Sequence, residues 1–173
     1  MPILIAVLGG LAAVYFFVNR AKNAADLSHD LLGVANDVRL AARRFGFQRR
    51  SNTHPADSIE DPKLAIATIA IAFLELDDLP TKEQRGLLDV QLRSTLRVSA
   101  QDSSELQILG RWLMNECQGP QPAITRLARV LFKLDGANSF EPLLTILKGI
   151  TTEDLSGAQR EAINDIRRGF KLH

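Results

Sequence analysis

The chain has 173 residues, of which 46% are hydrophobic, so it can bury a core and is not disordered throughout. Its 21 Lys and Arg nearly balance 20 Asp and Glu, and a formal net charge of +1 argues against nucleic-acid binding driven by overall charge. The single cysteine, Cys117, excludes an internal disulfide and suits a reducing compartment, and three dispersed histidines offer no structural zinc spacing.

The first element is an apolar segment. Residues 2–18 read PILIAVLGGLAAVYFFV, without a charge, and as a helix they would span about 25 Å, close to a bilayer core. We therefore predict a transmembrane anchor over residues 1–19. The alternative is a cleaved secretory signal, but such signals carry a positive region before the apolar run, and here only Met1 precedes it. Basic residues follow the run and none precedes it, which predicts that the amino terminus lies outside and the remainder is cytoplasmic. The expected location is therefore the cell inner (plasma) membrane, as a single-pass protein.

Small residues recur within this segment. Ala6 with Gly10, and Gly9 with Ala13, are four apart and would let two such helices approach closely. The alternative is that Gly and Ala are simply common in membrane helices. Self-association through the anchor is therefore a hypothesis.

An amphipathic helix is predicted over residues 20–50, because apolar residues recur there every three or four positions: Leu27, Leu31, Val34, Val38, Ala41 and Phe45. Its end is a basic window without acidic residues, formed by Arg39, Arg43, Arg44, Arg49 and Arg50. Three interpretations compete, namely contact with anionic lipid, contact with nucleic acid, and a solvated face that enforces topology. Beside a membrane anchor, lipid contact needs no further assumption, so membrane lipids are the expected partner and nucleic acid is not.

A polar stretch with Pro55, over residues 51–61, is predicted to be a linker, and residues 62–173 to be a soluble helical domain. Asp61 and Pro62 supply an N-cap and a proline in the first turn. The apolar run Leu64–Leu74 that follows is dense enough to predict the central buried helix.

Two capping boxes predict the next two helices. Thr81 with Gln84 opens one whose inner face carries Leu88, Leu92 and Leu96. Asp102 with Glu105 opens the other, which ends before Gly119 and carries Leu106, Leu109, Trp112 and Leu113. We interpret its tryptophan as a core residue and not as a ligand-stacking one.

Three further helices follow. One starts at Pro122 and stops at Gly136. Its predicted inner face carries Ile124, Leu127, Ala128 and Leu131. The next runs from Ser139 through Leu143, Leu144 and Leu147. The last begins near Ser156, which has capping-box spacing to Gln159, and buries Ile163, Ile166 and Phe170. No useful stretch alternates with period two, so the predicted fold class is all-α, a compact bundle of about six helices behind the anchor.

Two stretches carry a resemblance to a known family. LAIATIAIAFLELDDLPTKEQ, at residues 64–84, and DLSGAQREAINDIRRGF, at residues 154–170, resemble the TerB-like domain of tellurite-resistance proteins and of the amino-terminal region of the membrane-anchored co-chaperone DjlA. The resemblance covers roughly residues 64–172 and implies a small helical bundle. The J domain of DjlA has no counterpart, because His54-Pro55-Ala56 only superficially matches its His-Pro-Asp signature, so stimulation of an Hsp70 is not implied.

The family's two acidic turns have been linked to divalent cations. Here the first turn is Leu76–Leu79, which lacks the family's glycine, and the second is Thr151–Asp154, where Thr152 replaces an expected aspartate. Asp77 and Asp78 are candidate oxygen ligands for a hard cation. The alternative is a pair of acids at a helix end, since calcium takes about six to eight oxygens.

No catalytic constellation is recognisable. His29 lies on a polar flank, His54 lies in the linker, Cys117 has no histidine near it in sequence, and no glycine-rich loop could hold phosphate. We therefore expect no enzymatic activity and no cofactor. The first functional hypothesis is a membrane-anchored interaction module with an unidentified protein partner. The alternatives are an accessory subunit of a larger membrane complex and a module that responds to divalent cations.

Overall fold

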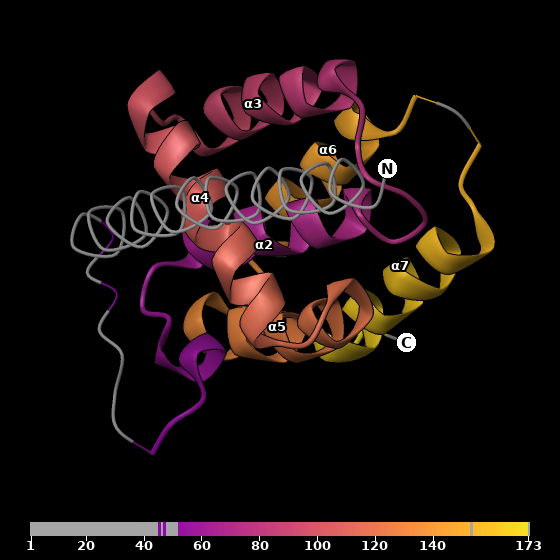
Figure 1. Ribbon diagram of the computed structural model, residues 1–173. Coiled ribbons are helices and arrows are strands. Elements are labelled where there is room, and N and C mark those ends of the chain that lie inside the picture. Colours follow the sequence, from indigo (N-terminus) through magenta and orange to yellow (C-terminus); the bar gives the residue numbers. More distant parts are fainter. Residues whose placement is uncertain (1–44, 46, 48–51, 153, 173) are drawn as a thin grey trace, which may run out of the picture. The chain divides into compact units, whose positions relative to one another are not determined.

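The computed structural model describes Phe45, Phe47, residues 52–152 and residues 154–172. These residues belong to one compact unit and form six α-helices and one short 3₁₀ helix, with no β-strand among them (Figure 1). The all-α bundle is thus confirmed. The predicted anchor over residues 1–19, and the helix over residues 20–50 apart from the two phenylalanines, lie outside the described residues. Across the part of the chain that is described, no helix is long and apolar enough to cross a membrane.

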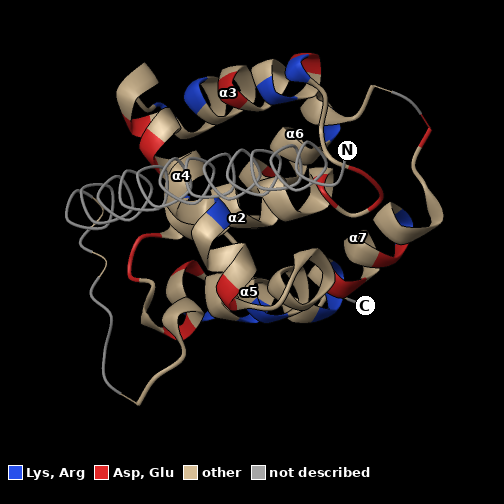
Figure 2. Cartoon of the chain, in the orientation of Figure 1, with Lys and Arg blue, Asp and Glu red and all other residues tan. Residues whose placement is uncertain are grey.

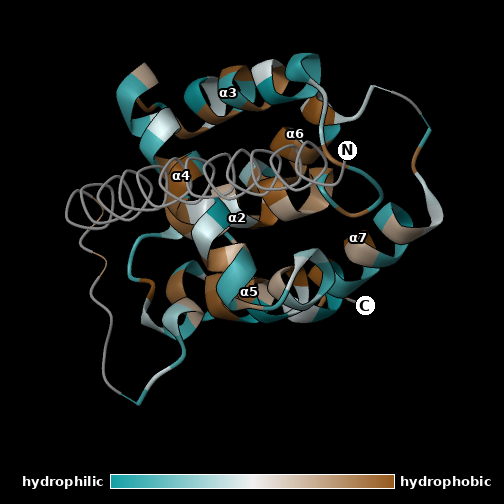
Figure 3. Cartoon of the chain, in the orientation of Figure 1, coloured by the Kyte–Doolittle hydropathy of each residue, from teal (hydrophilic) through white to brown (hydrophobic). Residues whose placement is uncertain are grey.

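Helix α2 (Pro62–Leu74) is the centre of the bundle. Its N-cap, Asp61, accepts a hydrogen bond of 2.9 Å from the backbone N–H of Lys63, and every residue of Leu64–Leu74 is buried. Helices α4 (Ala100–Glu116) and α5 (Pro120–Asp135) pack on it most extensively, with α3 (Lys82–Leu96) and α6 (Phe140–Ile150) also in contact. Figures 2 and 3 show α2 as almost uncharged and largely apolar. The prediction of a central buried helix is confirmed, as expected for a helix that is apolar all round.

Two glycines permit close helix crossings. A Cβ atom at Gly110 of α4 would lie 2.7 Å from Cδ1 of Ile71 and 3.3 Å from Cα of Thr68, both on α2. A Cβ atom at Gly169, in α7 (Gly157–Gly169), would lie 2.6 Å from Cβ of Ala128 on α5. The absence of a side chain therefore sets how near these helix pairs approach.

The capping boxes that open α3 and α7 are confirmed. Thr81 and Gln84 exchange side-chain-to-backbone hydrogen bonds of 2.9 and 3.2 Å. Ser156 and Gln159 do the same at 3.2 and 3.0 Å. The predicted inner face of α3 is buried, at Leu88, Leu92 and Leu96.

Two predicted helix starts are wrong by about one turn or less. Helix α4 begins at Ala100 with Ser99 as its N-cap, and Asp102 is the third helical residue that completes the capping box. The Ser99 hydroxyl accepts from the backbone N–H of Asp102 at 3.0 Å, and the Asp102 carboxylate accepts from the backbone N–H of Ser99 at 3.3 Å. This box caps the helix about one turn earlier than predicted. Helix α5 begins at Pro120 and not at Pro122, because an N–H is not needed in a first turn and both prolines fit there.

The predicted burial of the last helix is correct at Ile166 and Phe170 but wrong at Ile163, which is only partly buried. Ile163 faces a space between α6 and α7, so the bundle does not cover it. Trp112 packs at the edge of the core, with its ring centroid 5.6 Å from that of Phe47.

The segment predicted as a linker contains a 3₁₀ helix, η1 (Pro55–Ser58), that packs on α4 and α5. Ala56 is fully buried. The N-cap His54 accepts from the backbone N–H of Ala56 through Nδ1, and its Nε2 lies 3.2 Å from the carbonyl oxygen of Glu116. Asp57 pairs with Arg126 of α5 at 2.6 Å. Contacts with residues 62 and 69 positions further along the chain thus join this segment to the bundle.

Candidate functional site

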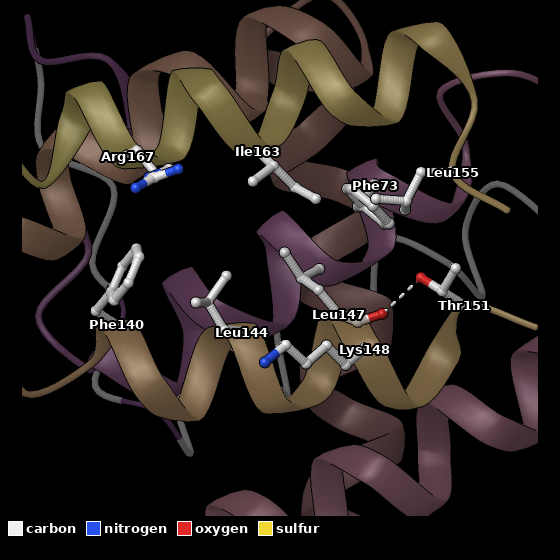
Figure 4. Close-up of a pocket in the computed structure, with 9 residues that line it drawn as sticks. All are labelled: Phe73, Phe140, Leu144, Leu147, Lys148, Thr151, Leu155, Ile163 and Arg167. Atoms are coloured by element: carbon white, nitrogen blue, oxygen red, sulfur yellow. Dashed lines mark hydrogen bonds between the residues drawn. The ribbon is translucent and has the colours of Figure 1, made fainter. Parts of the chain in front are cut away.

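An apolar groove of about 460 Å³ lies between α6 and α7. Helix α6 packs mainly on α3 and α2, whereas α7 packs on α5, so the two helices are held by different neighbours and leave a space between them. In Figure 4 the side chains of both helices point into this space from opposite sides, and Phe73 of α2 lies at its base. The volume is within the range of ligand-binding pockets, about 300 to 1,000 Å³.

The groove is lined mainly by apolar side chains. Leu144 and Leu147 come from α6, Ile163 comes from α7, and Leu155 precedes α7. Phe140 flanks the groove with its ring centroid 5.2 Å from that of the buried Phe170. Leu144, Leu155 and Ile163 are each only partly buried. The groove is therefore contiguous apolar surface that the described helices leave open to solvent.

The charged groups of the groove are both cations. Lys148 extends from α6 and Arg167 from α7, and both residues are exposed. Among the described residues neither cation forms an ion pair, and none of the lining residues is acidic. The hydroxyl of Thr151 donates to the carbonyl of Leu147 at 2.7 Å, so it is already used. The groove thus combines an apolar base with two cations on opposite walls.

Asp165 fastens the α7 wall to α5. Its carboxylate accepts hydrogen bonds of 2.8 Å each from Nε2 of Gln121 and the hydroxyl of Thr125, and it pairs with Arg168. Burial acts to raise the pKa of this carboxyl, but the bonds from Arg168, Thr125 and Gln121 outweigh it and lower the pKa below the ordinary value of 3.8. The ionised carboxylate is buried in the helix interface and so positions a wall of the groove without lining it.

The predicted cation ligands, Asp77 and Asp78, are exposed in the turn after α2. They line a polar cleft of about 260 Å³ together with Thr152 and Asp154 of the second acidic turn. Within the described ranges, no group of three or more His, Cys, Asp or Glu residues is arranged to hold a metal ion. The fold brings the two turns to one cleft, and cation binding stays a prediction.

The remaining predicted site residues lie outside the described part of the chain. They are the basic window, Arg39, Arg43, Arg44, Arg49 and Arg50, and the small residues of the anchor, Ala6, Gly9, Gly10 and Ala13. Lipid contact and helix self-association therefore stay predictions. Phe47, near the end of the basic window, is described, and its side chain is buried against Trp112 of α4.

Two of the polar groups considered for catalysis, Cys117 and His54, are described, whereas His29 lies outside the described residues. Cys117 is buried, and burial raises the pKa of its thiol, which disfavours the nucleophilic thiolate. Both ring nitrogens of His54 are engaged with backbone groups, of Ala56 and Glu116. The expectation of a non-enzymatic protein is untested by these contacts and stays a prediction.

Neither the groove nor the role of Asp165 is predicted from the sequence. A signal for the groove existed, because α6 is apolar over a wider arc than one packing face requires: Phe140, Leu143, Leu144, Ile146, Leu147 and Ile150. No local signal existed for Asp165, since Thr125 and Gln121 are 40 and 44 residues away. The groove has to be interpreted from its own geometry, because no family model, no curated protein and no solved structure matches this chain.

Proposed function

We propose that this chain is a non-enzymatic protein-interaction module, held at the cytoplasmic face of the bacterial inner membrane by its apolar segment over residues 2–18. The observation that carries the interaction role is the open apolar groove between α6 and α7. A concave, mostly apolar pocket with a few polar groups at its edge is the usual form of a binding site. The membrane location is supported by the length of the uncharged run and by the basic residues that follow it.

The membrane part of the proposal is tested by fractionation. The full chain is expected to stay with membranes after an alkaline carbonate wash, and deletion of residues 2–18 is expected to release it. A reporter fused to the carboxyl terminus, active only on the cytoplasmic side, should be active. A full chain that the wash releases would contradict the anchor.

The interaction part is tested by photo-crosslinking in intact cells. A photoreactive side chain replaces Leu144 in the groove or, as the control, Val90, which is 55% exposed on α3 and does not line the groove. A protein partner in the groove is expected to give a discrete adduct from position 144, absent from position 90 and abolished by Ile163→Asp. Equal labelling from both positions would contradict a partner bound in the groove.

An accessory subunit of a membrane complex is the first alternative, and it differs in stoichiometry. After extraction in mild detergent, native sizing with mass spectrometry should show a free module as a monomer or dimer. Stoichiometric co-purification with one complex would instead favour the subunit. In that case the groove would be a permanent interface.

A divalent-cation-responsive, TerB-like module is the second alternative. The observation that favours it is the cleft shared by the two acidic turns, with Asp77, Asp78 and Asp154 on its walls. It predicts an upward thermal shift in millimolar calcium or magnesium that Asp77→Ala abolishes. Glu83→Ala, at an exposed acidic position on α3, should leave the shift intact. Absence of any shift would end this alternative.

A further inference from the structure

The walls of the groove are fixed before any ligand binds. Helix α6 is held from behind by α3 and α2, and α7 is held by α5. Leu143 and Ile146 of α6, and Ala162 and Ile166 of α7, are buried and do not line the groove. A ligand in the groove therefore meets a preformed surface, which lowers the entropic cost of binding.

The length of the groove suits a helix. The 11 residues of α6 and the 13 residues of α7 correspond to helices about 16 and 20 Å long. A third helix of about three turns, laid between them, would cover the partly exposed side chains of Leu144, Leu155 and Ile163. It would pack on them as α6 and α7 pack on their own neighbours.

The charges of the groove indicate what such a helix carries. Lys148 and Arg167 lie on opposite walls, as Figure 4 shows, with no acidic residue in the lining. A neutral apolar helix would bring two cations without partners close to an interface, which costs solvation free energy. A helix with Asp or Glu beside its apolar stripe would pair with both cations, and such complementarity selects partners.

A fatty acid fits these features less well. Pockets for small ligands bury most of the ligand surface, about 70–90%, whereas this groove is open along one side. A single carboxylate would also meet one cation and leave the cation on the opposite wall without a partner.

Resting on the proposed function, we infer that the groove between α6 and α7 binds an amphipathic helix of a partner protein whose apolar stripe is flanked by acidic residues. Leu144 and Ile163 receive the stripe. Lys148 and Arg167 pair with an acidic residue on either side of it. The two cations are thus specificity determinants of the groove.

The test uses the full chain in lipid nanodiscs and a displayed library of helical peptides. Each peptide has about 14 residues, or four turns, with a leucine stripe whose flanking positions vary among Glu, Gln and Lys. Selection on the full chain is expected to enrich Glu at the flanks. The selected peptides should bind K148E/R167E at least about tenfold more weakly, the loss expected from reversing two charge pairs at a partly desolvated interface. They should bind R85E normally, because Arg85 is exposed on α3 away from the groove.

The outcomes separate the two proposals. The selected peptides could bind L144D more weakly, as expected for binding in the groove, and yet show no preference for Glu at the flanks. That result would overturn the acidic specificity and leave the interaction module intact. Failure to enrich any peptide that is sensitive to L144D would overturn the helix, and the interaction module would fall with it only if position 144 also gave no discrete crosslinked adduct in cells. Saturable dodecanoate binding that L144D abolishes, with no peptide selected, would replace the helix by a fatty acid. K148Q/R167Q, which removes charge without reversing it, should give an intermediate loss and guards against misfolding of the doubly reversed chain.

Discussion

Replacement of Asp165 by alanine tests how α7 is attached. The hydrogen bond that Gln121 Nε2 donates to the charged carboxylate of Asp165 contributes about 1.5 kcal/mol to stability. The Thr125 hydroxyl loses less, because the carbonyl of Gln121 lies 3.2 Å away as a second acceptor. The pair with Arg168, whose side chain is 73% exposed, adds only about 0.5 kcal/mol. Alanine is the better helix former by about 0.6 kcal/mol, so Asp165→Ala should lower the free energy of unfolding by roughly 1.5 to 2 kcal/mol at neutral pH.

The assay is urea unfolding of the full chain followed by circular dichroism, with hydrogen exchange over α7 as the local readout. Asp165→Asn serves as the matched variant, since it keeps the shape and one acceptor but loses the charge. The pKa of Asp165 is lowered in the folded chain, so its contribution is present above the ordinary value of 3.8 and is lost as pH falls through the folded-state pKa. The stability difference between wild type and Asp165→Asn should therefore be constant near neutral pH and shrink below pH 3.8.

Asp57, whose pKa is lowered chiefly by its hydrogen bond from Arg126, titrates in the same acidic range. It is present in both chains, so its effect cancels in their difference. An unchanged free energy of unfolding in Asp165→Ala would refute the proposed attachment of α7. A difference between wild type and Asp165→Asn that persists undiminished well below pH 3.8 would refute the electrostatic reasoning.

The remaining predictions concern packing, capping and reactivity. Gly110→Ala should lower the free energy of unfolding by about 1 to 3 kcal/mol, because its Cβ would lie 2.7 Å from Cδ1 of Ile71. Gly86→Ala, with open space around its Cβ, should instead raise the free energy of unfolding by about 0.5 to 1 kcal/mol. Equal effects of the two variants in urea titrations would contradict the close helix crossing at Gly110. Ser99→Ala should cost about 1 kcal/mol and speed hydrogen exchange in the first turn of α4, and no loss would contradict the assigned helix start. Cys117 should react with a maleimide much more slowly in the folded chain than in denaturant, because it is 6% exposed and burial raises the pKa of its thiol; equal rates would contradict its burial.

Much of the helix pattern is predictable because its causes are local. Thr81 with Gln84, and Ser156 with Gln159, satisfy backbone groups within a single turn. The apolar density of α2 likewise predicts burial without knowledge of its neighbours. The error at the start of α4 has the same origin, since Ser99 and Asp102 form a second capping box beside the predicted one and local patterns alone do not rank the two.

The position of the helices relative to one another depends on contacts between residues far apart in sequence. The spacing of apolar residues in α7 predicts that Ile163 is buried. It stays partly exposed because α7 packs on α5, whereas α6 packs on α3 and α2. The partners of Asp165 are 40 and 44 residues away, and the two acidic turns reach one cleft only through the fold. The amino-acid sequence alone accounts for which segments are helical, because caps and periodicity act over three or four residues. The groove arises from tertiary structure, because it depends on how competing helix contacts are satisfied across the whole bundle.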